Sequence, residues 1–249
     1  MGSLTDKVAV ITGGASGIGR ATSLVLSHEG AKIVIADVQA ESSEEVASEI
    51  RNQNADVLTV TVDVTQPQSV QAMVQEILKN YGRIDILVNI VGGSLPKAVL
   101  EMSDADWDRS IDLNLKSAFL CCRAVLPIMV EQHYGKIVNF SSAQAFSGSA
   151  TRASYTAAKA GIVGFSKSLA LEVMPHGINV NVVAPGLVET RRIRAMFSDD
   201  EWEKVTATRP MGRAVFPEEI ARAVLFLVQD TQASISGLTV HVNGGALMI

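Results

Sequence analysis

Residues 8–19 have the sequence VAVITGGASGIG, an apolar run that passes directly into a glycine-rich segment, and a helical pattern follows from Arg20 to His28. Glycines at such a turn let the backbone approach a pyrophosphate, and the N-terminus of the following helix stabilises its negative charge. The segment therefore predicts a dinucleotide-binding turn, with an ordinary tight turn as the alternative. We expect cofactor contacts from Gly13, Ser16, Gly17, Ile18 and Gly19.

Short apolar runs rich in valine and isoleucine recur along the chain, separated by longer helical patterns. Continuous hydrophobicity is typical of strands buried on both faces, and the intervening segments are long enough for crossover helices. We predict one α/β domain over residues 1–249, a doubly wound Rossmann fold with a seven-stranded parallel sheet flanked by helices. The predicted strands are Val8–Ile11, Lys32–Ala36, Val57–Val62, Ile84–Val88, Lys136–Phe140, Asn179–Val183 and Leu238–Val242.

Residues 187–210 do not fit this alternation, because they contain no strand pattern and place charged side chains around a few large apolar ones. In a doubly wound fold, an insertion after a late strand lies at the carboxyl edge of the sheet, where ligands bind. We therefore predict that this segment is a substrate lid.

The composition favours a globular protein with a small-molecule partner. A hydrophobic share of 47%, a net charge of -5 and a pI near 5.4 support a sizeable core and exclude the basic surface that binds nucleic acid or anionic membranes. The only cysteines, Cys121 and Cys122, are adjacent and the four histidines are scattered, so we predict neither a disulfide nor a metal site. Without a targeting pattern or an apolar run of the about 20 residues that a membrane span needs, we expect a cytoplasmic protein.

Two acidic residues stand at predicted strand ends. Asp37 ends the second strand, where a dinucleotide site places an acid to bind the adenosine ribose, and a carboxylate there would repel a 2′-phosphate. Asp63 ends the third strand and is a candidate for contact with adenine, together with Val64. For both acids the alternative is a structural role in a turn.

Tyr155 and Lys159 are four residues apart in a helical pattern from about Ala153 to Met174, so their side chains share one face. A tyrosine has a pKa near about 10, and a neighbouring ammonium lowers it towards the range useful for acid–base catalysis. Such a pair alone is also compatible with a solvated helix face. Ser142 follows the fifth strand and reaches the same sheet edge as the glycine-rich turn, whereas Asn114 lies in a helical segment and is compatible with a packing role.

Taken together, these elements resemble the short-chain dehydrogenase/reductase family over essentially the whole chain. The matching elements are Thr12 to Gly19, Asn114, Ser142, Tyr155 with Lys159, and Pro185-Gly186.

The resemblance implies that Tyr155 exchanges the substrate hydroxyl proton while Ser142 hydrogen-bonds the reacting oxygen. It further implies that Lys159 binds the nicotinamide ribose and lowers the pKa of Tyr155, and that Asn114 holds a water linking Lys159 to bulk solvent. It also implies a homotetramer built from the helices that carry Asn114 and Tyr155.

The resemblance adds further cofactor contacts and a cofactor choice. Family members that prefer NADP usually carry a basic residue in the glycine-rich turn or after the second strand, and this chain has none there, so we expect NAD. Two departures from the family pattern are Ile90-Val91 in place of Asn-Ala, which questions the contacts beside adenosine, and Asn243 in place of aspartate. The added contacts are Asn89, Val91, Gly92, Tyr155, Lys159, Pro185, Gly186, Val188 and Thr190.

The candidate substrate residues are mostly apolar, which favours an apolar, cyclic or aromatic secondary alcohol over a polyol. One alternative is a 3-oxoacyl-thioester reductase that uses NADPH, and another is a dinucleotide sensor without turnover. The candidate substrate contacts are Ser94, Gln144, Phe146, Leu187 and Met196.

Overall fold

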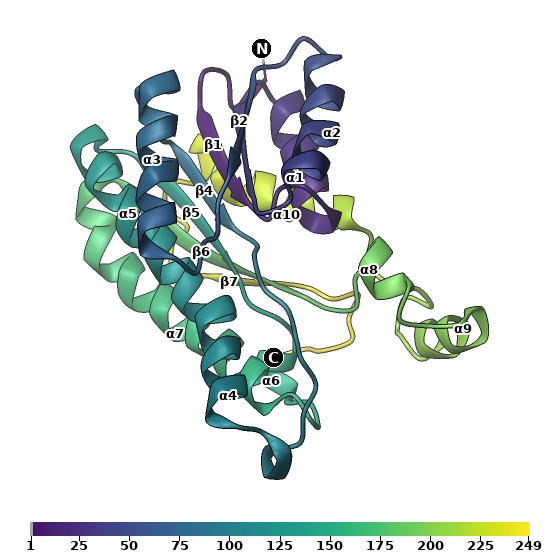
Figure 1. The fold of residues 1–249 in the computed structure, drawn as a ribbon. Coiled ribbons are helices and arrows are strands. Elements are labelled where there is room, and N and C mark those ends of the chain that lie inside the picture. Colours follow the sequence, from purple (N-terminus) through teal and green to yellow (C-terminus); the bar gives the residue numbers. More distant parts are fainter. Residues whose placement is uncertain (1) are drawn as a thin grey trace.

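The computed structural model describes residues 2–249. Its centre is one parallel sheet of seven strands in the order β3-β2-β1-β4-β5-β6-β7 (Figure 1). The predicted fold class and all seven strands are confirmed, with ends that differ by a few residues. The strands are β1 (Val8–Thr12), β2 (Lys32–Asp37), β3 (Val57–Thr61), β4 (Ile86–Asn89), β5 (Gly135–Phe140), β6 (Ile178–Pro185) and β7 (Thr239–Val242).

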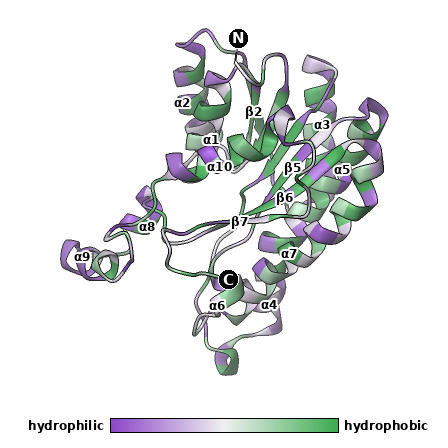
Figure 2. Cartoon of the chain, turned by 180° about the vertical axis from the view of Figure 1, so that it is seen from behind, coloured by the Kyte–Doolittle hydropathy of each residue, from purple (hydrophilic) through white to green (hydrophobic). Residues whose placement is uncertain are grey.

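Two layers of helices cover the sheet, one on each face (Figure 1). Alternate residues of a strand point to opposite faces, so Val10 packs in the core beneath α3, α5 and α7, whereas Ile11 packs in the core beneath α1, α2 and α10. The central strands are therefore mostly apolar (Figure 2). These helices are α1 (Gly17–His28), α2 (Ala40–Arg51), α3 (Pro67–Tyr81), α5 (Ser117–Gln132), α7 (Ala153–Val173) and α10 (Pro217–Val228).

The strand order reverses between β1 and β4, and in open parallel sheets ligands bind at such a switch point beyond the carboxyl ends. The segment predicted to be a lid projects from the body near this edge and forms two short helices, α8 (Arg191–Arg194) and α9 (Asp199–Ala207) (Figure 1). The Ser198 hydroxyl and the Glu201 carboxylate form the capping box that begins α9. A movement of this segment stays a prediction.

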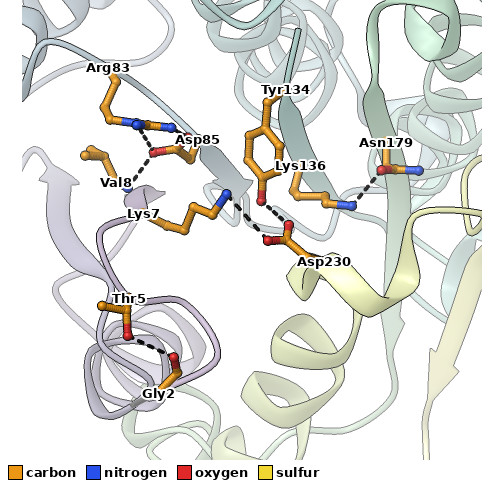
Figure 3. Close-up of polar contacts among 10 residues, drawn as sticks. All are labelled: Gly2, Thr5, Lys7, Val8, Arg83, Asp85, Tyr134, Lys136, Asn179 and Asp230. Carbon is orange, nitrogen blue, oxygen red and sulfur yellow. Dashed lines mark hydrogen bonds and ion pairs between the residues drawn. The ribbon is translucent and has the colours of Figure 1, made fainter. Parts of the chain in front are cut away.

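The opposite, amino edge of the sheet carries a polar network (Figure 3). The buried Asp85 carboxylate accepts hydrogen bonds from the Val8 N–H at 2.9 Å and from the Arg83 guanidinium at 2.8 and 2.6 Å. Beside it, the Tyr134 hydroxyl donates to Asp230 at 2.7 Å, and the ammonium of Lys7 lies 3.6 Å from the same carboxylate. These contacts join the starts of β1, β4 and β5.

The remaining long helical stretch, residues 104–132, joins α4 (Asp104–Ile111), a π-helical segment (Asp112–Lys116) and α5. By length and composition alone it could cross a membrane, which the sequence analysis did not anticipate. Its side chains Leu120, Cys121, Cys122 and Val125 are buried in the core beneath α3, α5 and α7, as in a core helix. The two cysteines are free, and burial raises the pKa of the Cys121 thiol to about 12.

Candidate active site

The glycine-rich turn between β1 and α1 has a conformation that requires glycine. Gly13 and Gly17 have φ angles of 70° and 50°, and a Cβ atom on Gly19 would lie 1.9 Å from the carbonyl oxygen of Gly13. Ser16 precedes α1 in an extended conformation, and its hydroxyl makes no capping hydrogen bond. The first-turn N–H groups of a helix have no intrahelical acceptor, so this turn is suited to an anionic phosphate.

Asp37 holds the glycine-rich turn in place. Its carboxylate accepts hydrogen bonds from the N–H groups of Ala15 and Gln39, each at 3.1 Å, and the residue is only 8% exposed. Each oxygen keeps a lone pair for a further donor, such as a ribose hydroxyl. Asp63 differs, because it is exposed and its carboxylate accepts hydrogen bonds from the N–H and hydroxyl of Thr65, which is the structural alternative anticipated for it.

The loop after β4 lies against the glycine-rich turn at the switch point. The Ile90 N–H donates to the Thr12 hydroxyl at 3.1 Å, and a Cβ atom on Gly13 would lie 3.3 Å from the Val91 side chain. Val91 packs against the core beneath α3, α5 and α7, and Ile90 packs against the core on the other face of the sheet. Partial burial therefore accommodates the apolar side chains that replace the usual Asn-Ala. Val64 is buried in the segment that follows β3.

Asn89 makes contacts that the sequence analysis missed. Its amide donates to Asn139 Oδ1 at 2.8 Å, and Asn139 in turn donates to the Ser166 hydroxyl at 2.9 Å. All three residues are buried. Asn89 therefore links β4 to β5 and α7, and the signal that could have revealed this is Asn139, a polar residue inside an apolar strand.

Asn114 lies in the π-helical segment, a helix variant that is frequent at functional sites. Its Oδ1 accepts from the Gly93 N–H at 2.9 Å, and its Nδ2 donates to the carbonyl oxygens of Gly93 and Ser110, both at 2.9 Å. A Cβ atom on Gly92 would lie 2.7 Å from Asn114 Oδ1 and 3.0 Å from Lys159 Nζ. Asn114 thus fixes the loop that separates it from Lys159.

Ser142, Tyr155 and Lys159 come together where β5 and α7 meet. The Lys159 ammonium donates to the carbonyl oxygen of Phe140 at 2.8 Å and lies 5.9 Å from the centre of the Tyr155 ring. The Ser142 hydroxyl accepts from the Gln144 N–H at 3.2 Å. The predicted catalytic residues therefore share one edge of the sheet.

Burial dominates the electrostatics of this group. Desolvation lowers the pKa of Lys159 from 10.5 to about 8. It also raises the pKa of Tyr155, although hydrogen bonding with Ser142 and the charges of Arg152 and Arg192 act in the opposite direction. The expected lowering of the Tyr155 pKa by Lys159 is therefore not present in the chain alone, because burial of the phenol outweighs the neighbouring charges.

The segment after β6 closes the other side of the site. Pro185 ends the strand and its carbonyl accepts from the Ala143 N–H at 2.9 Å, while the Gly186 N–H donates to Val242 at 3.0 Å. Val188 is buried and pairs with Val215. The Thr190 hydroxyl accepts from the Ile193 N–H at the start of α8, and a Cβ atom on Gly17 would lie 3.1 Å from the Thr190 methyl group.

The predicted substrate residues lie on segments that follow β4, β5 and β6, at the same edge of the sheet. Phe146 in α6 (Gln144–Ser147) packs edge-on against His241 with ring centres 4.7 Å apart. Leu187 is half-buried and Met196 is 59% exposed, whereas the Ser94 hydroxyl is buried without a hydrogen-bond partner in residues 2–249.

Sequence reasoning missed two arginines beside these residues. A Cβ atom on Gly93 would lie 3.3 Å from Arg192 Nη1, and Arg152 Nη1 lies 3.5 Å from Gln144 Oε1. Both arginines were visible in the sequence, but only the fold brings them close to Tyr155.

The site fits a dinucleotide. The glycine-rich turn leaves no room for side chains where a pyrophosphate would lie, Asp37 has acceptor capacity, and Lys159 is a buried donor beside the tyrosine. Between residues 2 and 249 there is no group of three His, Cys, Asp or Glu side chains that could hold a metal ion.

The chain is similar to known proteins over nearly its whole length. Residues 13–246 match a family model described as enoyl-(acyl carrier protein) reductase. The chain is 41% identical over 243 residues to 3-oxoacyl-[acyl-carrier-protein] reductase FabG of Escherichia coli (strain K12), with 98% of both chains covered. It is 39% identical to (2S)-[(R)-hydroxy(phenyl)methyl]succinyl-CoA dehydrogenase subunit BbsD of Thauera aromatica, with 97% of both covered. The crystal structure of levodione reductase superposes with a TM-score of 0.92 at 33% identity, covering 97% of this chain and 98% of that one.

Proposed function

The chain belongs to the short-chain dehydrogenase/reductase family of oxidoreductases, and we propose that it interconverts a secondary alcohol and a ketone with NAD(H) as the hydride carrier. The observation that carries this proposal is the group formed by Ser142, Tyr155 and Lys159 beside a glycine-rich turn held by Asp37.

The choice of NAD over NADP rests on Asp37. A 2′-phosphate beside this nearly buried carboxylate would meet a like charge in a region of low dielectric, whereas ribose hydroxyls would donate hydrogen bonds to it. Ala15 and Ser16, in the adjacent turn, offer no cation to compensate a phosphate.

The chemistry divides between the cofactor and the chain. When bound, the nicotinamide supplies or accepts the hydride. In the direction of oxidation, Tyr155 takes the proton from the substrate hydroxyl, and Ser142 orients the reacting oxygen. Lys159 binds the nicotinamide ribose and holds a positive charge near the phenol, which favours the phenolate.

Asn114 positions the loop of Gly92 and Gly93 beside Lys159 and keeps a free lone pair on Oδ1 that a relaying water can use. The proton taken by Tyr155 would leave the site past Lys159 and the water at Asn114.

An apolar, cyclic or aromatic part of the substrate is supported by Phe146, Leu187 and Met196 at the carboxyl edge of the sheet. The Thauera aromatica relative is named for a compound that has a phenyl group on the hydroxyl-bearing carbon, in agreement with this choice.

The main alternative is a 3-oxoacyl-thioester reductase that uses NADPH, and it is favoured by the Escherichia coli relative. Asp37 and the absence of a basic residue beside the glycine-rich turn weigh against NADPH. A dinucleotide sensor without turnover is disfavoured because all four predicted catalytic side chains are present.

The direct test is the variant Tyr155→Phe, assayed by the absorbance of reduced nicotinamide. We expect kcat to fall by about a hundredfold or more, because a general acid–base contributes about 10² to 10⁴ in rate. NAD binding, measured separately by calorimetry, should change little. Turnover near that of the wild type would contradict the assignment.

We also propose that the protein is a cytoplasmic homotetramer that associates through α5 and α7. The support is the exposed apolar side chains on these helices or next to them: Phe119 in α5, Leu171 in α7 and Met174 directly after α7 are 39%, 81% and 41% exposed. The mass measured by light scattering tests this proposal, and Leu171→Glu should reduce it.

A further inference from the structure

Two cations without an acidic partner flank the catalytic tyrosine. Arg152 stands immediately before α7, three residues from Tyr155, and Arg192 lies in α8, in the segment predicted to be the lid. Neither arginine forms an ion pair with any acid in the part of the chain that the structure describes.

The Arg192 side chain lies close to the loop that follows β4. Its Nη1 lies 3.3 Å from the position of a Cβ atom on Gly93, whose backbone is fixed by Asn114. The guanidinium therefore reaches from α8 to the loop after β4. Within residues 2–249 it makes no hydrogen bond, so its five N–H donors remain available.

Arg152 approaches the site from the other side. Its side chain is half-buried, and its single side-chain hydrogen bond within residues 2–249 is the 3.5 Å contact with Gln144 Oε1, at the long limit for such a bond. The charges of Arg152 and Arg192 both lower the pKa of Tyr155, as expected for two cations close to the phenol.

Some other arginines of the chain have an acidic partner. Arg194, two residues from Arg192, pairs with Asp199, and Arg213 pairs with Glu219 through two hydrogen bonds. Five of the twelve arginines pair with a carboxylate within residues 2–249, and Arg152 and Arg192 are the two of the other seven whose charges act on Tyr155.

We propose that Arg152 and Arg192 bind an anionic group of the substrate, so that the substrate is a hydroxy or oxo compound with a negative charge near the reacting carbon. A guanidinium presents paired donors that match a carboxylate or a phosphate. Phe146 and Met196 then contact the apolar part. This inference rests on the proposed function and narrows its substrate class.

The test compares matched substrates that differ in charge. The first pair is 3-hydroxy-3-phenylpropanoate and its methyl ester, which tests a carboxylate on the substrate itself. The second pair is 3-hydroxy-3-phenylpropyl phosphate and 1-phenylpropane-1,3-diol, which tests a phosphate in place of the carboxylate. The variants are Arg152→Gln and Arg192→Gln, with Arg191→Gln as the control of equal charge change on the same helix.

We expect the wild type to prefer the charged member of one pair. Either variant should reduce that preference by about tenfold or more through KM, the loss expected for one charge-assisted hydrogen bond. Arg191→Gln should retain the preference. The pair that shows the effect identifies the source of the charge.

Equal turnover of charged and neutral members in both pairs would overturn the anion proposal while leaving the proposed function intact. If no member of either pair is turned over, the result contradicts the proposed function and leaves the anion site to be tested by binding. Calorimetric binding of the unreactive 3-phenylpropanoate to wild type and Arg192→Gln then decides on the anion site. Binding that is equal in both proteins, or absent from both, would overturn it.

Discussion

Asn114 holds the backbone of Gly93 from both sides, with Oδ1 2.9 Å from its nitrogen and Nδ2 2.9 Å from its oxygen. Replacing Asn114 by alanine leaves these two backbone groups without partners in a half-buried loop. We expect the free energy of unfolding to fall by about 1 to 3 kcal/mol and kcat to fall as well. Chemical denaturation and steady-state kinetics measure the two effects, and an unchanged kcat would show that the loop needs no such support.

Gly92 separates Asn114 from Lys159, and a Cβ atom there would lie 2.7 Å from Asn114 Oδ1 and 3.0 Å from Lys159 Nζ. We expect Gly92→Ala to lower kcat/KM at least about tenfold, since a displacement of about 1 Å at a reacting group has large effects on rate. The kinetic assay that uses reduced nicotinamide measures this loss.

Gly82→Ala is the matched control for that variant. Gly82 has a φ of 70° with no atom within 4 Å of its Cβ position, and it lies at the end of α3. Alanine there should cost about 1 kcal/mol of stability through backbone strain alone, with kcat/KM retained. Equal losses of activity in both variants would mean that the Gly92 effect is only a loss of stability.

Lys159 makes stability depend on pH. Burial lowers its pKa from 10.5 to about 8 in the folded chain, so between these values the unfolded chain binds more protons. The unfavourable burial of the cation is fully present below pH 8 and is relieved as pH rises towards 10.5. Relative to Lys159→Met, the wild type should gain about 3 kcal/mol of unfolding free energy across this window.

Denaturant unfolding of both proteins at several pH values measures this gain. Lys79→Met, at an exposed position of α3, is the control and should show the same pH dependence as the wild type. A Lys159→Met profile parallel to that of the wild type would contradict the burial of a titrating amine.

Asp85 stabilises the amino edge of the sheet. It is 0% exposed and accepts hydrogen bonds from Val8 and Arg83. Asp85→Ala should lower the unfolding free energy by about 1 to 3 kcal/mol, because it leaves the buried Val8 N–H without an acceptor, whereas the half-exposed Arg83 guanidinium can turn to water. The comparison is Asp112→Ala, which removes an exposed pair with Lys116 and should cost less than about 1 kcal/mol. Losses of similar size in the two variants, measured by thermal and chemical unfolding, would contradict the larger contribution expected from the buried carboxylate.

The sequence predicted the fold because the strands are apolar on both faces, so Val10 and Ile11 identify β1 without any knowledge of their partners. It also predicted which strand ends would meet, since carboxyl ends of parallel strands share an edge. Asn89 was different. Its link to Asn139 joins positions 50 residues apart, and no local pattern encodes that pairing.

Electrostatic properties were the least predictable part of the site. The spacing of Tyr155 and Lys159 suggests a lowered tyrosine pKa, but burial of the phenol reverses the direction in the chain alone. Arg152 and Arg192 are forty residues apart, and their common approach to Tyr155 depends on where α8 is placed by the end of β6.

The reaction proposed for this enzyme is hydride transfer between NAD and a secondary alcohol. The most direct measurement is the initial rate of nicotinamide reduction with NAD or NADP, against aromatic, cyclic, sugar-derived and hydroxyacyl alcohols. We expect turnover with NAD and an alcohol that has an apolar body, and a shift towards NADP in Asp37→Asn. Activity confined to NADPH and a 3-oxoacyl thioester, measured in the reverse direction, would contradict it.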